Sequence, residues 1–252
     1  MPLRTVEPLR LYRQIAGQIA TLIDNGEFPP GSRLPAEREL ATLLGVSRTS
    51  VREAIISLEI AGRVEVRVGS GIFVVAGPAI PSNTADKGPG PFELLNARML
   101  IEGEIAAQAA RAAKPEDLEA LRRTLVRMKD HIEDFAIREE SDRDFHLGMA
   151  KATRNSSLEL VVEGLWNQRA ELWGRIQLHF HTPALARRTV HDHAAILAAL
   201  VAQDPEAARA AMHRHLERVI REFQRSVNVR PAANKRGAAA IPKRGSRLPA
   251  RA

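Results

Sequence analysis

A proline- and glycine-rich stretch, GPAIPSNTADKGPGP at residues 77–91, divides the sequence into two unequal parts. Proline cannot donate a backbone hydrogen bond and fixes its own φ angle, and glycine weakens any regular element, so this stretch predicts a linker. We therefore expect one domain over residues 1–76 and a second over residues 92–226. The remaining residues, 227–252, are rich in Ala, Pro, Lys and Arg, and we expect them to be disordered.

The first part has the pattern of three short helices followed by a β-hairpin. Apolar residues recur at helical spacing between Leu9 and Asn25, and again between Ala36 and Leu44, where Gly45 supplies a left-handed end. Ser47 can cap a third helix. The runs RVEVRV and IFVV then flank a GSG turn, which is typical of a hairpin. Three helices and a hairpin predict a winged helix-turn-helix.

The third helix, in GVSRTSVREAII, carries an apolar stripe and two arginines. Val51, Ala54, Ile55 and Leu58 follow i, i+3, i+4, i+7 spacing and should be buried. Arg48 and Arg52 are one turn apart, and on the helical wheel both project away from the stripe. A guanidinium can bridge O6 and N7 of guanine, which suits a DNA-reading helix. The alternative is a solvated helix whose arginines pair with the acidic residues Glu53 or Glu59.

The run PPGSRLPAERELATLLGVSRTSVREAIISLEIAGRVEVRVGSGIFV resembles the N-terminal domain of GntR-family bacterial transcriptional regulators. The resemblance implies double-stranded DNA as the partner. It also implies that the DNA contacts are made by Arg38, Ser47, Arg48, Thr49, Arg52 and Gly69. Val68 stands where some relatives have a polar residue at the wing tip, which argues against a base contact from that position.

The net charge of +7 does not by itself indicate a DNA partner, because of where it lies. The tail over residues 227–252 contains seven basic residues and no acid, whereas residues 1–78 contain nine basic and eight acidic residues. The case for DNA therefore rests on the placement of a few arginines. The chain has no cysteine, no long apolar run and no apolar signal-peptide core at its N-terminus, so we expect a cytoplasmic protein without a membrane partner.

The second part is almost entirely helical in pattern. Breaks such as Lys114-Pro115 and Asp204-Pro205 predict six helices, near 92–113, 116–135, 138–153, 157–180, 184–203 and 205–225. No strand pattern is evident. An all-α bundle is therefore expected, and the whole chain is expected to be mainly α.

Four polar residues of this part are predicted to face one interior. Asp142 and His146 share a helix face, and an Asp and a His at i, i+4 can converge on one cation. The HDH and HRH doublets each offer two histidines, and the helical wheel places His193 and His215 inward, on the apolar stripes of their helices. The cluster is then either a divalent metal site or a packed polar core.

Arg98 lies within the apolar stripe of the helix that begins at Phe92. A buried guanidinium must be paired, and the partner is either Glu102, four residues on, or an anionic ligand in a cavity. His179 and His181 match no motif and are expected at the surface. Trp166 and Trp173 share one face and are expected in the core or in a subunit interface.

Residues 92–225 resemble the effector-binding FCD domain of the FadR subgroup of GntR regulators. The resemblance implies that Asp142, His146, His193 and His215 hold a divalent metal ion, with Zn²⁺ favoured and Ni²⁺ or Mn²⁺ possible. The segments GPFELLNARMLIEGEIAAQAA, LWNQRAELW and DHAAILAAL also resemble members that respond to hexuronates and related sugar acids.

The function implied is a homodimeric regulator, expected to be a repressor, that binds a pseudo-palindromic operator and responds to a small carboxylate. Arg98 is the expected effector contact. Two alternatives stay open at this point: a metal-dependent hydrolase that uses the Asp/His set to activate water, and a non-specific architectural DNA-binding protein that uses the basic tail.

Overall fold

The computed structural model describes residues 10–67, 70–76, 89–173 and 183–226. In this part of the chain the fold is mainly α, with one two-stranded sheet, as the sequence predicts. The elements in chain order are α1 (Leu11–Asp24), α2 (Glu37–Leu44), α3 (Arg48–Ile60), β1 (Val64–Arg67), β2 (Gly71–Val74), α4 (Pro91–Ala112), α5 (Pro115–Asp130), α6 (Phe135–Ala152), α7 (Ser156–Trp173), α8 (Pro183–Val201) and α9 (Pro205–Ser226).

The N-terminal elements form the expected reading head, by which we mean α1 to β2. Gly45 ends α2 with a left-handed φ of 65°, and Ser47 caps α3 by accepting a hydrogen bond from the backbone N–H of Ser50 at 3.1 Å. The strands β1 and β2 pair antiparallel, with Arg67 opposite Gly71 at the turn end of the hairpin. The wing residues Val68 and Gly69 lie outside the described residues.

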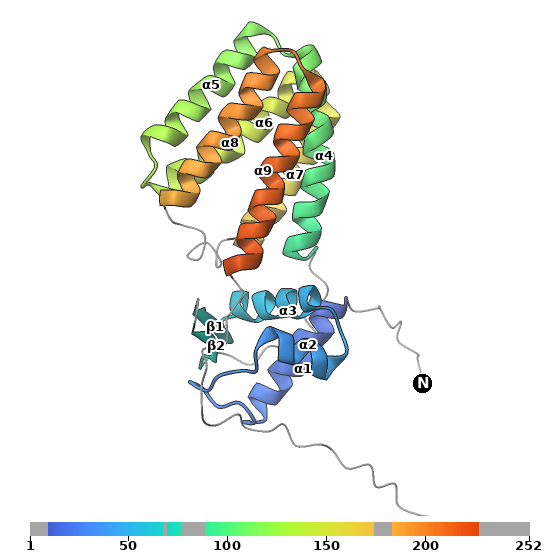
Figure 1. The fold of residues 1–252 in the computed structure, drawn as a ribbon, viewed down its shortest axis with the longest axis vertical. Coiled ribbons are helices and arrows are strands. Elements are labelled where there is room, and N and C mark those ends of the chain that lie inside the picture. Colours follow the sequence, from blue (N-terminus) through green and yellow to red (C-terminus); the bar gives the residue numbers. More distant parts are fainter. Residues whose placement is uncertain (1–9, 68–69, 77–88, 174–182, 227–252) are drawn as a thin grey trace, which may run out of the picture.

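The helices α4 to α9 form a bundle that stands on the reading head, with the N-terminus of α4 and the C-terminus of α9 nearest to α3 (Figure 1). The expected helix over 116–135 is shorter than predicted, because α5 ends at Asp130. Asp134 instead caps the next helix by accepting a hydrogen bond from the N–H of Ile137. The expected helix over 157–180 is described as far as Trp173, so His179 and His181 lie outside the described residues.

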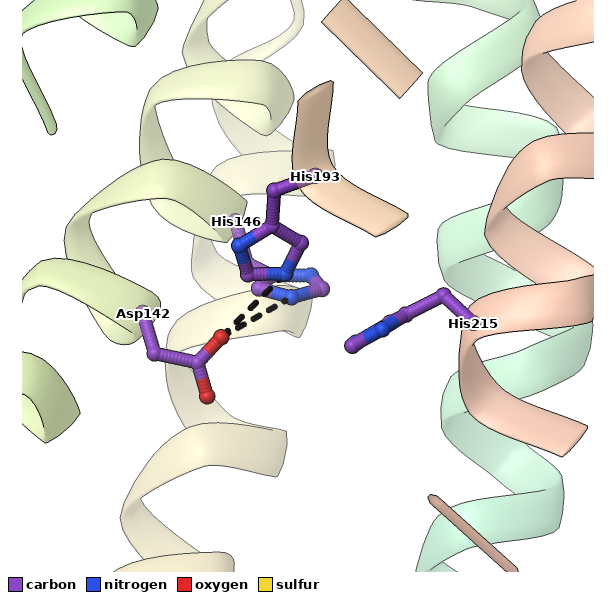
Figure 2. A group of neighbouring side chains, drawn as sticks. All are labelled: Asp142, His146, His193 and His215. Carbon is purple, nitrogen blue, oxygen red and sulfur yellow. Dashed lines mark ion pairs between the residues drawn. The ribbon is translucent and has the colours of Figure 1, made fainter. Parts of the chain in front are cut away.

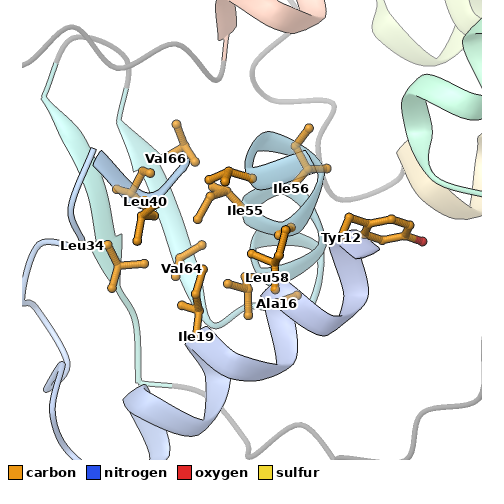
Figure 3. Packing of buried hydrophobic residues seen from close by; sticks show 14 of the residues in the cluster. Tyr12, Ala16, Ile19, Leu34, Leu40, Ile55, Ile56, Leu58, Val64 and Val66 are labelled. Carbon is orange, nitrogen blue, oxygen red and sulfur yellow. The ribbon is translucent and has the colours of Figure 1, made fainter. Parts of the chain in front are cut away.

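The two groups of helices share a hydrophobic core at their junction. Buried side chains of α1, α3 and the hairpin, among them Ile19, Ile55 and Val64, form the centre of the reading head (Figure 3). Phe92 and Leu95 of α4 and Phe223 of α9 belong to the same cluster. The reading head is thus packed directly against the ends of two bundle helices. A second core, built around α4 to α9, fills the bundle.

Candidate metal centre and nucleic-acid interface

Asp142, His146, His193 and His215 come together inside the bundle, from α6, α8 and α9 (Figure 2). Each residue offers one ligand atom, and these atoms all lie within 4.8 Å of one another. Oδ1 of Asp142 lies 3.3 Å from Nε2 of His193 and 3.7 Å from Nε2 of His146. Carboxylate and imidazole donors at this separation are suited to one divalent cation.

The helical-wheel selection among the histidine doublets agrees with the structure. His193 and His215 are buried, at 0% and 2% exposure, whereas His191 is exposed and His213 is partly exposed. His213 packs against α4 at Gly103, where an added Cβ would lie 2.3 Å from its Nε2. The first histidine of each doublet therefore faces away from the cluster.

The cluster contains buried polar atoms without hydrogen-bond partners. These atoms include Oδ1 of Asp142 and Nε2 of both His146 and His193. An unpartnered buried polar atom costs about 1–3 kcal/mol, so three in one place require an explanation. Burial also lowers the pKa of His193 and of His215, which keeps both imidazoles neutral. Neutral imidazoles beside a carboxylate fit a cation, because each presents a lone pair.

Two further carboxylates lie beside the Nδ1 atoms of His146 and His215. Oε2 of Glu102 lies 2.6 Å from Nδ1 of His146, and Oδ2 of Asp192 lies 3.3 Å from Nδ1 of His215. A carboxylate at Nδ1 favours the imidazole tautomer that carries its proton on Nδ1. The lone pair of Nε2 is then free to bind a cation. No sequence pattern singles out Asp192, since its partner is on another helix.

Burial and nearby charges act in opposite directions on these two carboxylates. Burial would raise the pKa of Glu102, but the charge of Arg98 and the close approach of His146 lower it well below its usual range. Burial would likewise raise the pKa of Asp192, but hydrogen bonds to His215 and Arg218 lower it to about 2. Both groups are therefore carboxylates at neutral pH.

Arg98 is paired with Glu102, which is one of the two alternatives that the sequence left open. Its Nε and Nη2 donate to Oε1 and Oε2 of Glu102, at 2.7 and 3.2 Å. The guanidinium also lies 4.3 Å from the ring centre of Trp166, whose other guanidinium neighbour is Arg169 at 4.5 Å. Trp166 is 2% exposed and belongs to the core, as expected.

A pocket beside the cluster shares two of its residues. Asp142 and His215 form part of the wall, together with four arginines and a mixed polar and apolar remainder. The lining residues are Arg98, Phe135, Arg138, Glu139, Asp142, Arg169, Leu185, Ala186, Thr189, His215, Arg218, Val219 and Glu222. Arg138, Arg169 and Arg218 were not singled out from the sequence. The segment LWNQRAELW contains Arg169, but it also contains other polar residues, so nothing in the sequence distinguishes Arg169.

In the reading head, the predicted DNA contacts divide into exposed and buried residues. Ser47, Arg48 and Thr49 are exposed at the N-terminal end of α3, and Arg38 is exposed near the start of α2. Gly69 lies outside the described residues. The exposed arginines are free to approach a groove edge or a phosphate.

Arg52 points away from the apolar stripe, but it is not exposed at the surface where the DNA contact is expected. Arg52 is 5% exposed and donates from Nε and Nη2 to the two carboxylate oxygens of Glu37, at 3.1 and 2.8 Å. Its direction on the helical wheel is as predicted, but α2 packs over that side of α3 and supplies the partner. Arg52 therefore joins the two helices of the helix-turn-helix, and a direct DNA contact would require it to leave Glu37.

Comparison with known proteins identifies the class of molecule. The model described as "Bacterial regulatory proteins, gntR family" matches residues 11–74, and the FCD domain model matches residues 93–218. The chain belongs to the GntR family of bacterial transcriptional regulators and carries an FCD domain. Its relatives are regulators and not enzymes, which argues against the hydrolase alternative.

Two relatives from Escherichia coli (strain K12) match along most of the chain. The Exu regulon transcriptional regulator is 42% identical over 222 residues, covering 84% of this chain and 83% of that protein. The Uxu operon transcriptional regulator is 39% identical over 229 residues, covering 87% of this chain and 89% of that protein.

Among solved structures, Streptococcus agalactiae GntR matches with 27% identity and a TM-score of 0.45, covering 83% of this chain and 99% of its own. Within the described residues, no helix is both long and apolar enough to cross a membrane.

The inward histidines should be required for metal binding and the outward ones should not. His193→Ala and His215→Ala are each expected to lower metal content and the thermal midpoint, because an ion that binds only the folded state stabilises it. His191→Ala should change neither. Metal analysis and melting curves after reconstitution with Zn²⁺, Ni²⁺ or Mn²⁺ provide the measurement. Equal metal content in all three variants, or none in the wild type, would show a polar core without an ion.

Arg48 and Arg52 should respond differently to replacement by alanine. Arg52→Ala leaves Glu37 buried and unpaired, so we expect a loss of about 3–5 kcal/mol in the free energy of unfolding. Arg48→Ala should leave stability unchanged and lower operator affinity by about 1–3 kcal/mol. Chemical denaturation and DNA titration measure the two effects. Equal stability of the two variants would contradict the structural role of Arg52.

Proposed function

We propose that this transcriptional regulator is a repressor that binds a pseudo-palindromic operator as a homodimer and is controlled by a small carboxylate, with a hexuronate or related sugar acid favoured. The observation that carries the effector proposal is the pocket, in which four arginines face the same space as Asp142 and His215. Arginine recognises carboxylates through paired N–H donors. The names of the Exu and Uxu relatives support the same class of effector.

The polar groups of the pocket favour a hydroxylated acid over an apolar one. Glu139, Thr189 and Glu222 line the pocket and can accept hydrogen bonds from sugar hydroxyls. Each of these groups already has an arginine partner, so a hydroxylated ligand would use their remaining acceptor capacity.

The Asp/His cluster is proposed to hold a divalent ion at the wall of the pocket. Nitrogen and oxygen ligands together suit Zn²⁺, Ni²⁺ or Mn²⁺. The buried atoms of Asp142, His146 and His193 that have no hydrogen-bond partner would be ligands of the ion. Such an ion supplies positive charge that attracts a carboxylate. Arg98, Arg169 and Arg218 then orient that carboxylate by hydrogen bonding.

Two helices carry groups of both the pocket and the shared core, which supports coupling between effector and operator. On α9, Arg218 and Glu222 line the pocket, while Phe223 is buried in the core of the reading head. Val219 takes part in both. Effector and operator would each favour one arrangement of this junction, so each would weaken binding of the other.

A direct polar contact adds to this junction. Glu53 of α3 accepts a hydrogen bond from the backbone N–H of Phe92, at the start of α4. A Cβ on Gly90 would lie only 3.2 Å from Oε1 of Glu53, so glycine permits the approach. The recognition helix thereby contacts the helix that carries Arg98.

The homodimer is proposed from the exposed apolar residues of the bundle. Leu100 on α4 and Leu160 and Val161 on α7 are 66%, 67% and 42% exposed, and these two helices pack side by side. Large exposed apolar residues on adjacent helices are typical of a protein interface. Two reading heads related by a twofold axis would meet two half-sites of a palindrome.

The effector proposal is tested by calorimetry on metal-loaded protein with glucuronate and galacturonate. Glucose and galactose, which lack the carboxylate, serve as matched ligands and should not bind. Arg98→Gln should weaken hexuronate binding by about 10- to 100-fold, since a hydrogen bond to a charged group contributes about 1.5–3 kcal/mol. Arg123→Gln, which removes an exposed charge from α5, should have no effect. Absence of heat for every sugar acid, hydroxy acid and dicarboxylate tried would refute the proposal.

The coupling proposal is tested with Glu53→Ala. The quantity measured is the operator affinity without galacturonate divided by the operator affinity with it. In this variant the ratio should fall toward one, because the contact between α3 and the start of α4 is removed. Metal content should stay unchanged. Glu39→Ala, an exposed acid on α2, is the control. A ratio equal to that of the wild type would show that Glu53 takes no part in coupling.

A further inference from the structure

Three arginines that line the pocket are paired with carboxylates of the chain itself. An effector carboxylate competes with these internal carboxylates for the N–H donors of the guanidinium groups. The outcome of that competition depends on how firmly each internal carboxylate is held. The three pairs are Arg98–Glu102, Arg169–Glu139 and Arg218–Asp192.

Two of these carboxylates are also held by a histidine of the cluster. Glu102 is fully buried and lies 2.6 Å from Nδ1 of His146. Asp192 lies 3.3 Å from Nδ1 of His215. If either carboxylate left, a histidine and an arginine would both lose their partner, and an uncompensated buried charge is strongly destabilising. These two pairs are therefore fixed parts of the interior.

Glu139 differs from both, because within the described residues its ion pair is with Arg169 alone. It accepts from Nη1 and Nη2 of Arg169 at 2.5 and 2.7 Å. Its side chain is 28% exposed, so water can solvate the carboxylate once it is released. A partly exposed ion pair contributes little net stability. The pair can therefore open at low cost when another carboxylate takes the place of Glu139.

Arg169 lies where the pocket meets the Asp/His cluster. Its Nη2 is 3.7 Å from Oδ2 of Asp142, whereas Oδ1 of Asp142 faces His146 and His193. The guanidinium also lies 4.5 Å from the ring centre of Trp166, which restricts its orientation. A carboxylate bound to the end of this guanidinium would therefore lie beside Asp142, where a divalent ion held by the cluster would also attract it.

We propose that Glu139 occupies, in the effector-free protein, the place on Arg169 that the carboxylate of the effector takes when it binds. This inference rests on the proposed function and adds to it an internal competitor. The exchange keeps Arg169 paired with a negative charge throughout. The released carboxylate still lines the pocket and can accept a hydrogen bond from a sugar hydroxyl.

The exchange has consequences for selectivity and for regulation. A neutral sugar cannot replace the charge that Arg169 loses, so displacement of Glu139 selects acids. Because the effector must displace Glu139, this residue raises the effector concentration needed for a response. Glu139 lies on α6 and Arg169 on α7, so the exchange also releases one tie between these helices.

The test is calorimetry with galacturonate on the Zn²⁺-loaded full chain carrying Glu139→Gln. Removal of the competing charge should tighten binding by about 5-fold. Glu139→Ala should do the same, because neither replacement carries a charge, and metal content should stay at the wild-type level in both. Glu140→Gln removes the neighbouring exposed charge, which pairs with Arg127 of α5, and should match the wild type.

A double variant separates displacement from a general effect of charge. Arg169→Gln should weaken galacturonate binding. Adding Glu139→Gln to it should bring no gain, because the donors for which the two carboxylates compete are gone. A gain of about 5-fold in this background would show that Glu139 acts on the ligand at a distance, and would overturn the exchange.

Unchanged or weaker binding in both single variants of Glu139 would likewise overturn the exchange. A lowered thermal midpoint beside it would assign the pair to holding α6 against α7. The two proposals fail separately. If the wild type binds galacturonate and the Glu139 variants bind it no tighter, only the exchange fails. If the wild type binds no sugar acid, hydroxy acid or dicarboxylate, the effector proposal fails and the exchange fails with it.

Discussion

The contacts of the buried carboxylate of Glu102 hold together the polar interior of the α4–α9 bundle. The carboxylate is fully buried, accepts two hydrogen bonds from Arg98 and lies 2.6 Å from His146. A buried charge without such partners would cost several kcal/mol, so the three residues stabilise one another. Arg98 is thereby held against Trp166 at the pocket, and His146 presents Nε2 to Asp142. The pocket and the Asp/His cluster are therefore linked through Glu102.

Asp192 repeats this arrangement on the other side of the cluster. It accepts hydrogen bonds from Arg218, which lines the pocket, and from His215, which belongs to the cluster. Each supporting carboxylate therefore serves one histidine and one arginine. His215 and Arg218 lie on the same helix as Phe223, which is buried in the core of the reading head.

The features that could be predicted from the sequence are those that depend only on the spacing of residues along one helix. The periodicity of α1 and α3 identified their buried faces, and the helical wheel separated His193 from His191 because both lie on α8. The sequence could not reveal that Arg52 meets Glu37, since that contact depends on how α2 packs against α3. The same limit explains Asp192 and Arg169, whose roles come from partners on other helices. For Arg98 the sequence offered the correct partner, because Glu102 is four residues away.

The sorting of charge in the reading head explains how a nearly neutral domain can recognise DNA. Nine basic and eight acidic residues lie in residues 1–78, but the two signs are distributed differently in space. Arg52 and Arg63 are buried and paired with Glu37 and Asp24, so they hold helices together and contribute little outside. Arg38 and Arg48 remain exposed. Since counterion release depends on the phosphates actually contacted, a few placed arginines suffice. The seven basic residues and no acid in the segment 227–252 account for the whole net charge of +7, so the net charge gives no information about this sorting.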